Sequence, residues 1–406
     1  MRGLYWLLAG GVCVFGAVPV LFNVAAATHA KAHEGWTAVT PAATRHPSRV
    51  SPIVGVRRVG QGPLAVAVDD RMRHVFVANF LDGTITMLDT ARGTVLRTTP
   101  PVALRPDLIA VDGRAGRVFI GDGQDGGGVV VLDAATAAVV RRVRIGARLL
   151  AIAPDERTGR TFVLTSDPRV SMLDGPSGRL VRTIPVGDGG PHAVTVDERD
   201  GRVLLTTDTA IQELDAHTGA PRGTVGTVPS PTFVAVAPQK GRIVVLGAAG
   251  APGAYVYGVY VVDIHTGVIA HRTVVGGLPT AIAVDDRTTR IFVVDGDALD
   301  TLDARSAVLL RRRRIGTYPF IMPVVATRQG VVFVVAGLTR PSSQVNVSVL
   351  DATTGVVRRT IAVSPPVYLR SIGFPFIALA VSERTERAYV TNAVGNTVTV
   401  LDTSHI

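Results

Sequence analysis

Short apolar runs alternate with polar turns along nearly the whole chain. Residues 65–69 are apolar and end in Asp, residues 74–79 give a second run, residues 84–89 a third that ends in Leu-Asp, and residues 94–98 a fourth. Apolar runs of about five residues are typical of β-strands packed between sheets. Because no period of 3.6 residues is sustained beyond the N-terminal segment, the pattern predicts an all-β protein.

This four-strand unit recurs. The third strand of each unit closes on an aspartate, and these aspartates lie 40 to 51 residues apart: Asp89, Asp133, Asp174, Asp215, Asp263, Asp303, Asp351 and Asp402. A period in the forties that carries four strands predicts the blades of a β-propeller. One blade cannot bury both of its faces, so the blades must form a ring. The eight units predict eight blades, or seven if residues 319–351 are irregular.

The two ends of the repeat region complement each other. The last unit stops after its third strand, whereas residues 53–60 form a strand with no unit of its own. Their sequence matches the fourth strand of other units, such as residues 140–146. We therefore expect this N-terminal strand to complete the last blade and to leave no open sheet edge.

Residues 75–79 (Val-Phe-Val-Ala-Asn) and 388–392 (Ala-Tyr-Val-Thr-Asn) resemble the motif that names the YVTN repeat family, and residues 190–194 (Gly-Pro-His-Ala-Val) resemble the start of its first strand. The resemblance to these YncE-like proteins covers roughly residues 53–406. It implies a β-propeller, but it does not imply one function, because this fold serves many.

The N-terminus predicts export. Arg2 precedes an uncharged apolar run over residues 4–22, and small residues follow. This pattern fits a cleaved signal peptide, and the run is also long enough to be an uncleaved membrane anchor. Either interpretation places the rest of the chain outside the cytoplasm, as a secreted, periplasmic or cell-surface protein. We predict a signal peptide or anchor over residues 1–30, a flexible spacer over 31–50 and the propeller over 51–406.

Composition removes several classes of function. Cys13 is the only cysteine and lies in the N-terminal apolar run, which excludes disulfides and cysteine metal sites from the repeats. There is no phosphate-binding glycine loop followed by lysine, no haem-attachment motif and no Gly-x-Ser-x-Gly motif. We therefore predict no cofactor, and we expect a monomer whose only contact with a membrane is through residues 4–22 if they are retained.

Aspartates occur in two kinds of turn. Leu-Asp-x-x-Thr-Gly phrases, as at residues 214–219 and 350–355, are typical of tight hairpins in which Asp accepts amide hydrogens and Gly takes a positive φ. Acidic clusters in second-to-third strand loops have oxygen ligands at a spacing that could hold Ca²⁺, although neither matches the EF-hand pattern. The weak metal candidates are Asp122, Asp125, Asp295 and Asp297.

His192 is a weak catalytic candidate. It lies where a first strand begins, near the expected mouth of the central channel. A lactonase- or lyase-type propeller enzyme would place its site there, built from His192, Asp122, Asp167 and Arg370. The positions taken as equivalent to His192 in the other blades are almost all apolar, which argues against a hydrolytic centre: Leu64, Leu108, Leu149, Phe233, Thr280, Val324 and Ile377.

Basic residues gather on the fourth strands. The formal net charge is +10, and residues 311–314 are four consecutive arginines, with pairs at residues 57–58, 141–142 and 358–359. Charges on an exposed edge strand prevent sheet-to-sheet aggregation. The alternative is a belt that binds a polyanion, either nucleic acid or an acidic envelope polymer.

The repeat departs most from its pattern in the second half. Residues 248–258 and 338–344 are insertions, and aromatic residues precede the last two units. Loops that depart from a rigid scaffold often bind partners. The sequence thus favours a non-enzymatic scaffold that binds a protein or polymer partner through one loop-rich face, which contains Tyr255, Tyr257, Tyr318, Phe320, Tyr368, Arg370 and Phe374.

Overall fold

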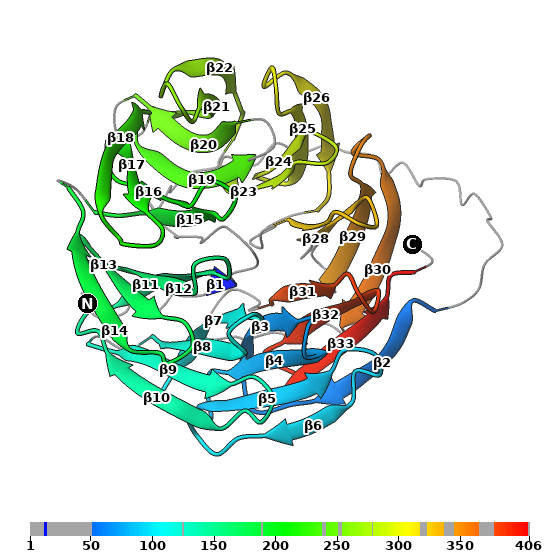
Figure 1. Ribbon diagram of the computed structural model, residues 1–406. Helices are drawn as coiled ribbons and strands as arrows, with labels where there is room; N and C mark the ends of the chain where they lie inside the picture. The colour runs from blue at the N-terminus through cyan, green and yellow to red at the C-terminus, as the bar shows by residue number, and fades with distance from the viewer. Residues whose placement is uncertain are drawn as a thin grey trace, which may run out of the picture.

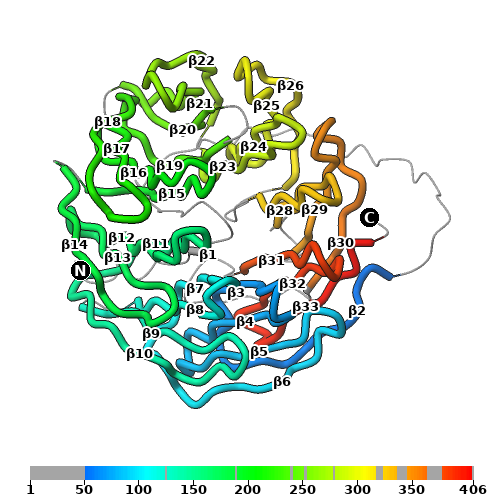
Figure 2. The backbone as a smooth tube through the Cα atoms, viewed as in Figure 1, coloured from blue at the N-terminus to red at the C-terminus, as the bar shows by residue number. Residues whose placement is uncertain are grey.

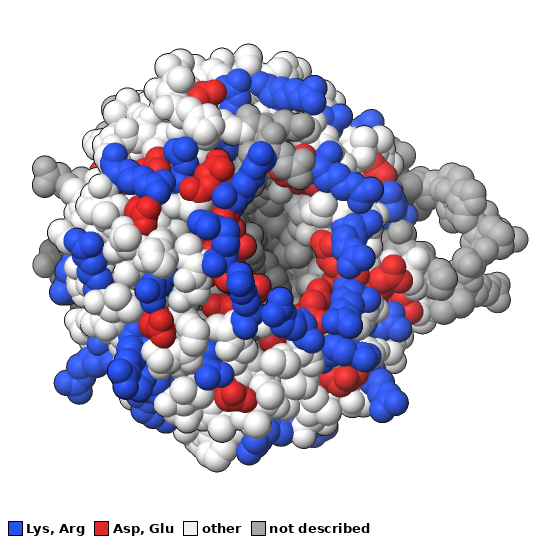
Figure 3. All heavy atoms as spheres, viewed as in Figure 1, with Lys and Arg blue, Asp and Glu red and all other residues white. Residues whose placement is uncertain are grey.

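The computed structural model describes residues 12–13 and 51–404, except 124–125, 188–189, 238–240, 251–253, 278, 317–322, 337–344 and 365–376. Within these residues it contains eight antiparallel four-stranded sheets arranged as a ring of blades (Figure 1). The space-filling view shows a hollow at the centre of the ring, which we call the central channel (Figure 3). A short strand, β1 (Val12–Cys13), pairs in parallel with the inner strand of blade 2. The predicted all-β propeller is confirmed. The rest of the proposed signal, anchor and spacer lies outside the described residues.

Each blade runs from an inner first strand to an outer fourth strand. Blades 1 to 4 contain β3 (Pro63–Asp69), β4 (His74–Asn79), β5 (Thr84–Asp89) and β6 (Val95–Thr98); β7 (Pro106–Asp112), β8 (Arg117–Asp122), β9 (Gly128–Asp133) and β10 (Val139–Arg144); β11 (Leu149–Asp155), β12 (Arg160–Thr165), β13 (Arg169–Asp174) and β14 (Leu180–Pro185); and β15 (Ala193–Asp197), β16 (Arg202–Thr206), β17 (Ala210–Asp215) and β18 (Pro221–Thr227). Blades 5 to 8 contain β19 (Pro231–Ala237), β20 (Arg242–Ala249), β21 (Val256–Asp263) and β22 (Ile269–Val274); β23 (Pro279–Asp285), β24 (Arg290–Asp295), β25 (Ala298–Asp303) and β26 (Leu309–Arg314); β27 (Val324–Ala326), β28 (Val331–Ala336), β29 (Val345–Asp351) and β30 (Val357–Ser364); and β31 (Leu379–Ser382), β32 (Arg387–Asn392), β33 (Thr397–Asp402) and β2 (Ile53–Arg58).

The ring closes as the sequence predicts. Strand β2 pairs antiparallel with β33, with Ile53 opposite Leu401 and Arg58 opposite Thr397, so the two ends of the repeat region share blade 8 (Figure 2). The amide of Asp402 also donates to the carbonyl of Pro52 over 2.7 Å. Blade 7 has all four of its strands, so the seven-blade alternative is wrong and the ring has eight blades.

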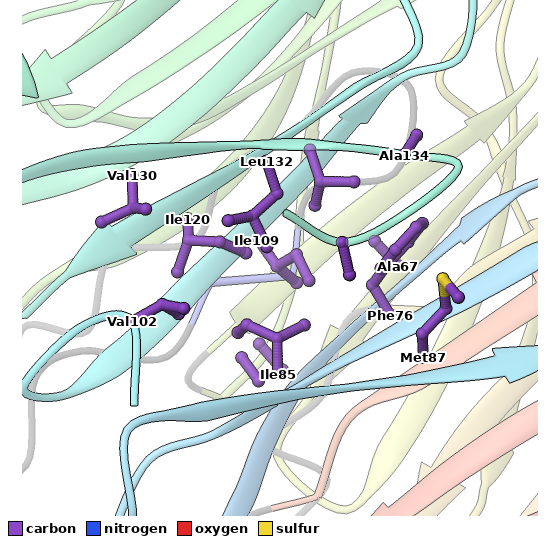
Figure 4. Packing of buried hydrophobic residues seen from close by; sticks show 14 residues of the cluster. Ala67, Phe76, Ile85, Met87, Val102, Ile109, Ile120, Val130, Leu132 and Ala134 are labelled. Carbon is purple, nitrogen blue, oxygen red and sulfur yellow. The ribbon is translucent and has the colours of Figure 1, made fainter. Parts of the chain in front are cut away.

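Apolar side chains from neighbouring blades share one core. Figure 4 shows Phe76 and Ile85 of blade 1 packed with Ile109 and Ile120 of blade 2, all of them fully buried. Full burial of such a side chain contributes about 1.5–3 kcal/mol. An aromatic ring occupies the third position of the second strand in six blades: Phe76, Phe119, Phe162, Phe292, Phe333 and Tyr389.

The Leu-Asp-x-x-Thr-Gly phrases form the predicted turns. In blade 4, Oδ1 of Asp215 accepts hydrogen bonds from the amides of His217 (3.0 Å) and Thr218 (2.7 Å) and from the Thr218 hydroxyl (2.8 Å). Gly219 follows at φ 71°, a conformation that favours glycine. These carboxylates therefore belong to the hairpins between the third and fourth strands.

Candidate binding surfaces at the two ends of the channel

The two ends of the channel differ in their connections. We call the end with the second-to-third and fourth-to-first connections the loop end, and the end with the first-to-second and third-to-fourth turns the turn end. The antiparallel order of every blade places each connection type at one end only. The described parts of the insertion at residues 248–258 lie at the loop end, and the short aspartate turns between described third and fourth strands lie at the turn end. The other insertion and the aromatic segments lie outside the described residues.

A recurring β-bulge shapes the mouth at the loop end. The pairing of the first and second strands shifts register at one residue in each of five blades, and these residues are Leu64, Asp107, Leu150, Thr232 and Thr280. A bulge leaves one residue outside the ladder and redirects its side chain. His192 and Ile377 take the corresponding positions of blades 4 and 8, because each bulged residue, like them, lies five positions before the last residue of its first strand.

This register corrects the positions that the sequence took as equivalent to His192. Leu108, Leu149 and Phe233 each lie one residue away from the bulged position, and the position for Val324 falls at residue 321, outside the described residues. The corrected set contains Asp107, so the mouth is less apolar than predicted. The sequence analysis missed this carboxylate because a bulge cannot be read from alternation alone.

Asp107 is a buried acid at this mouth, with 5% of its surface exposed. Burial, together with the nearby charge of Asp122, raises its pKa to about 7, although a backbone hydrogen bond and the charge of Arg148 lower it. A carboxyl group with this pKa changes its charge near neutral pH.

His192 pairs with Asp208, a residue that the enzyme hypothesis did not name. Its Nε2 lies 2.7 Å from Oδ1 of Asp208. Asp122 accepts the amides of Leu104 and Arg105 in its own part of the ring. The enzyme hypothesis also named Asp167 and Arg370. Asp167 accepts hydrogen bonds from Thr165 and Arg169, and Arg370 lies outside the described residues.

The proposed metal ligands of blade 6 bind arginines. Arg312 lies 2.9 Å from Asp295 and 3.0 Å from Asp300, and Arg314 lies 3.3 Å from Asp297. Burial raises the pKa of Asp300 to about 6, although Arg312 lowers it. Asp125 lies outside the described residues, and among those described no three His, Cys, Asp or Glu side chains are grouped to hold a metal ion.

Two of the seven residues predicted for the loop-rich face can be placed. Tyr255 and Tyr257 lie beside each other in blade 5, with ring centroids 6.4 Å apart. The remaining members lie outside the described residues: Tyr318, Phe320, Tyr368, Arg370 and Phe374. The structure adds exposed apolar side chains at the loop end that the sequence analysis did not single out, namely Leu81 and Leu104.

Comparison with known proteins supports the architecture. No protein-family model and no curated protein matches the sequence. Solved structures do match. Hydrazine synthase from Kuenenia stuttgartiensis is 13% identical, with a TM-score of 0.56 over 89% of this chain and 99% of that one. The computationally designed protein Ika8 is 17% identical, with a TM-score of 0.62 over 87% and 100%. BamB from Moraxella catarrhalis is 17% identical, with a TM-score of 0.55 over 87% and 100%.

The chain has a β-propeller fold. At these identities the likeness concerns the fold alone, and the function must be argued from the surfaces of the molecule. Within the described residues of the propeller, no helix is long and apolar enough to cross a membrane.

Several arginines of the outer strands fasten neighbouring blades of the propeller. Nε of Arg141 donates to the carbonyl of Ser177 over 2.9 Å, and Nε of Arg311 donates to that of Thr354 over 2.8 Å. Both acceptors lie in the third-to-fourth strand turn of the next blade. These bonds give the arginine-rich strands a structural role in joining blades, beyond the protection of an exposed edge.

Proposed function

We propose that this protein is an extracytoplasmic, non-enzymatic scaffold that binds a protein or polymer partner through the loop end of its propeller. The observation that carries the proposal is the hairpin of β20 and β21 in blade 5. Both strands contain eight residues, whereas the corresponding strands of blades 1, 2, 3 and 6 contain six. The extra residue pairs extend this hairpin at the loop end.

The end of the hairpin presents apolar surface to solvent. Tyr255 is 45% exposed and Val256 is 44% exposed. Tyrosines are enriched among the residues that dominate binding energy at protein interfaces, because one ring buries a large area at a small cost in conformational entropy. The exposed Tyr255 on a regular hairpin is therefore a suitable anchor for a partner.

The base of the hairpin is held by the core. Tyr257 is partly buried against the cluster that contains Phe233 and Val259, and burial raises the pKa of its phenol. Tyr260, three residues further along β21, is fully buried, with the guanidinium of Arg272 5.3 Å from its ring centroid. A surface held in place before binding loses less entropy when a partner docks.

The extracytoplasmic location rests on the N-terminal sequence, and the assignment of the repeats to the YVTN type rests on motifs such as residues 75–79, which form most of β4. The non-enzymatic role is supported by the hydrogen bonds and ion pairs of the acidic candidates. Asp295 and Asp297 face arginines, and Asp122 accepts backbone amides. Those interactions occupy oxygens that a catalytic or metal site would use.

The test compares two double variants of the full chain, each tagged at the C-terminus and purified from the cells that produce it. Tyr255→Ser with Val256→Ser removes the hairpin anchor, and Val139→Ser with Val140→Ser is the control, since these outer-strand residues are similarly exposed at 42% and 40%. We expect only the first variant to lose a partner that the wild type retains after washing, with melting temperatures within about 2 °C of one another. Equal retention by both variants would contradict the proposal.

A further inference from the structure

The turn end carries a ring of arginines around the channel. Seven of the eight blades have arginine at the second residue after the first strand, and each of these side chains is exposed: Arg71, Arg114, Arg157, Arg199, Arg287, Arg328 and Arg384. The corresponding position of blade 5, residue 239, lies outside the described residues. Figure 3 shows basic side chains gathered around the central hollow, with acidic side chains between them.

Glutamates that directly precede three of the ring arginines in sequence join one blade to the preceding one. Oε1 of Glu156 accepts the amide of Gly113 over 2.8 Å, and Oε1 of Glu198 accepts the amide of Glu156 over 3.0 Å. Glu383 accepts the amides of Thr327 (2.7 Å) and Arg328 (3.2 Å) in the same way. These acids accept hydrogen bonds from backbone amides of the preceding blade and so stabilise the ring of blades.

The seven arginines do not all have free guanidinium groups. Arg157 donates to the carbonyl of Glu198 in the next blade, and Arg199 also has a partner. Arg287 and Arg384 donate to backbone carbonyls of the adjoining blade, over 3.0 Å to Thr327 and 3.2 Å to Asp70. The guanidinium groups of Arg71, Arg114 and Arg328 make no hydrogen bond or ion pair with any residue that the structure describes. Each therefore offers its five N–H donors to a ligand.

The channel wall behind the ring is apolar. The residue before the last residue of each first strand is valine in seven blades and proline in one: Val68, Val111, Pro154, Val196, Val236, Val284, Val325 and Val381. In six of these blades the side chain is partly exposed although its strand is the innermost of the blade. A ligand that enters the mouth therefore meets guanidinium groups first and an apolar wall next.

We propose that the arginine ring is a binding site for an acidic segment of a partner protein, in which aspartate or glutamate side chains pair with the guanidinium groups and neighbouring apolar side chains contact the valine wall. Arginine binds carboxylates through two parallel hydrogen bonds, which gives both affinity and orientation. The site is at the opposite end of the channel from the blade 5 hairpin, so this inference does not depend on the proposed function.

Two other anionic partners fit the surface less well. Single-stranded nucleic acid binds through aromatic rings that stack on bases, and no aromatic residue occurs among the described first-to-second strand turns. Helices that bind an anionic membrane surface insert Trp, Phe or Leu side chains. The described turns at this end contain none of these, and their exposed large apolar side chains are Met72, Val268, Val308 and Val356.

The test uses fluorescent poly-L-glutamate and the full chain. Arg71→Gln with Arg114→Gln and Arg328→Gln removes the unpaired guanidinium groups. The matched control, Arg58→Gln with Arg144→Gln and Arg313→Gln, removes the same charge from exposed outer-strand positions. We expect wild-type binding that weakens with added salt, a loss of about tenfold in affinity for the ring variant, and a change of less than about twofold for the control.

Three results would overturn the inference. The first is that the wild type does not bind poly-L-glutamate. The second is that the two triple variants lose the same affinity, which would indicate a general effect of charge. The third is that a DNA strand or phosphatidylglycerol vesicles bind more tightly than poly-L-glutamate at the same charge concentration. Unchanged circular dichroism and melting temperature of both variants establish that the comparison concerns binding.

Discussion

The phenol of Tyr389 donates a hydrogen bond of 2.5 Å to the backbone carbonyl of Thr90 and so joins β32 of blade 8 to the turn after β5 of blade 1. Both residues are fully buried, and Thr385 donates to the same carbonyl over 2.9 Å. Burial raises the pKa of the Tyr389 phenol far above its usual range, which keeps the group protonated as the donor. The first and last blades are therefore joined by hydrogen bonds within their shared core. These bonds add to the pairing of β2 with β33, which completes blade 8 itself.

Removal of strand β2 should destabilise the whole ring. A chain that lacks residues 1–60 loses the outer strand of blade 8 and exposes the edge of β33, and an unpaired edge promotes aggregation. A chain that lacks only residues 1–50 keeps the seam. We expect the longer truncation to be aggregated or to melt at least about 10 °C lower, as size-exclusion chromatography and thermal denaturation would show. Equal melting temperatures would contradict the role of the seam.

Phe162→Ala should destabilise the fold strongly. Its ring is fully buried in the cluster between blades 3 and 4, and loss of a buried phenylalanine ring typically costs about 3–5 kcal/mol. Val181→Ala, at a position that is 48% exposed in the same blade, should cost less than about 0.5 kcal/mol. Chemical denaturation of both variants measures the difference. Similar midpoints would mean that the interface between these blades is not a tightly packed core.

Asp351→Asn should make the protein less sensitive to acid. Burial raises the pKa of Asp351, but Arg358 together with the amide and hydroxyl of Thr354 lowers it to about 2. Because the folded-state pKa is below the ordinary value of 3.8, the carboxylate stabilises the fold above pH 4, and this contribution is lost as the pH falls toward 2. The variant should be less stable than the wild type at pH 7, and the difference should shrink on acidification. Melting temperatures from pH 7 to pH 2 provide the measurement, and a difference that is constant over this range would contradict the assignment.

Asp107→Asn should have the opposite dependence on pH. The folded-state pKa of about 7 is above the ordinary value of 3.8, so Asp107 destabilises the fold progressively as the pH rises from 4 to 7. The asparagine stays neutral, and its gain in stability relative to the wild type should grow over this range, by on the order of 3–4 kcal/mol. A gain that does not change between pH 4 and pH 8 would mean that Asp107 is not a buried acid.

The repeat pattern made the fold predictable from sequence. Strand positions, the closing turns and the completion of blade 8 by residues 53–60 all follow from local alternation and from a period that recurs eight times. Each of these features depends on residues that are close in sequence or equivalent in the repeat. The packing of a blade on its neighbours then follows from the need to bury both of its faces.

The surfaces were less predictable, for two physical reasons. A β-bulge shifts the side-chain alternation by one residue, which is why Leu108 was taken as equivalent to His192 in place of Asp107. The arginine ring arises from single residues of separate blades, such as Arg71 and Arg114, which the circular arrangement brings to one mouth. Consecutive arginines at residues 311–314 gave a stronger sequence signal, yet Arg311 and Arg312 are engaged within the fold.

The most direct test of the proposed binding at the loop end is photo-crosslinking in the cells that produce the protein. A benzophenone amino acid replaces Tyr255 at the end of the blade 5 hairpin or, as the control, Val139 on an outer strand of similar exposure. We predict a crosslinked product of defined mass from position 255 and none of that mass from position 139. No product at position 255, or the same product at both positions, would contradict a binding surface at the loop end.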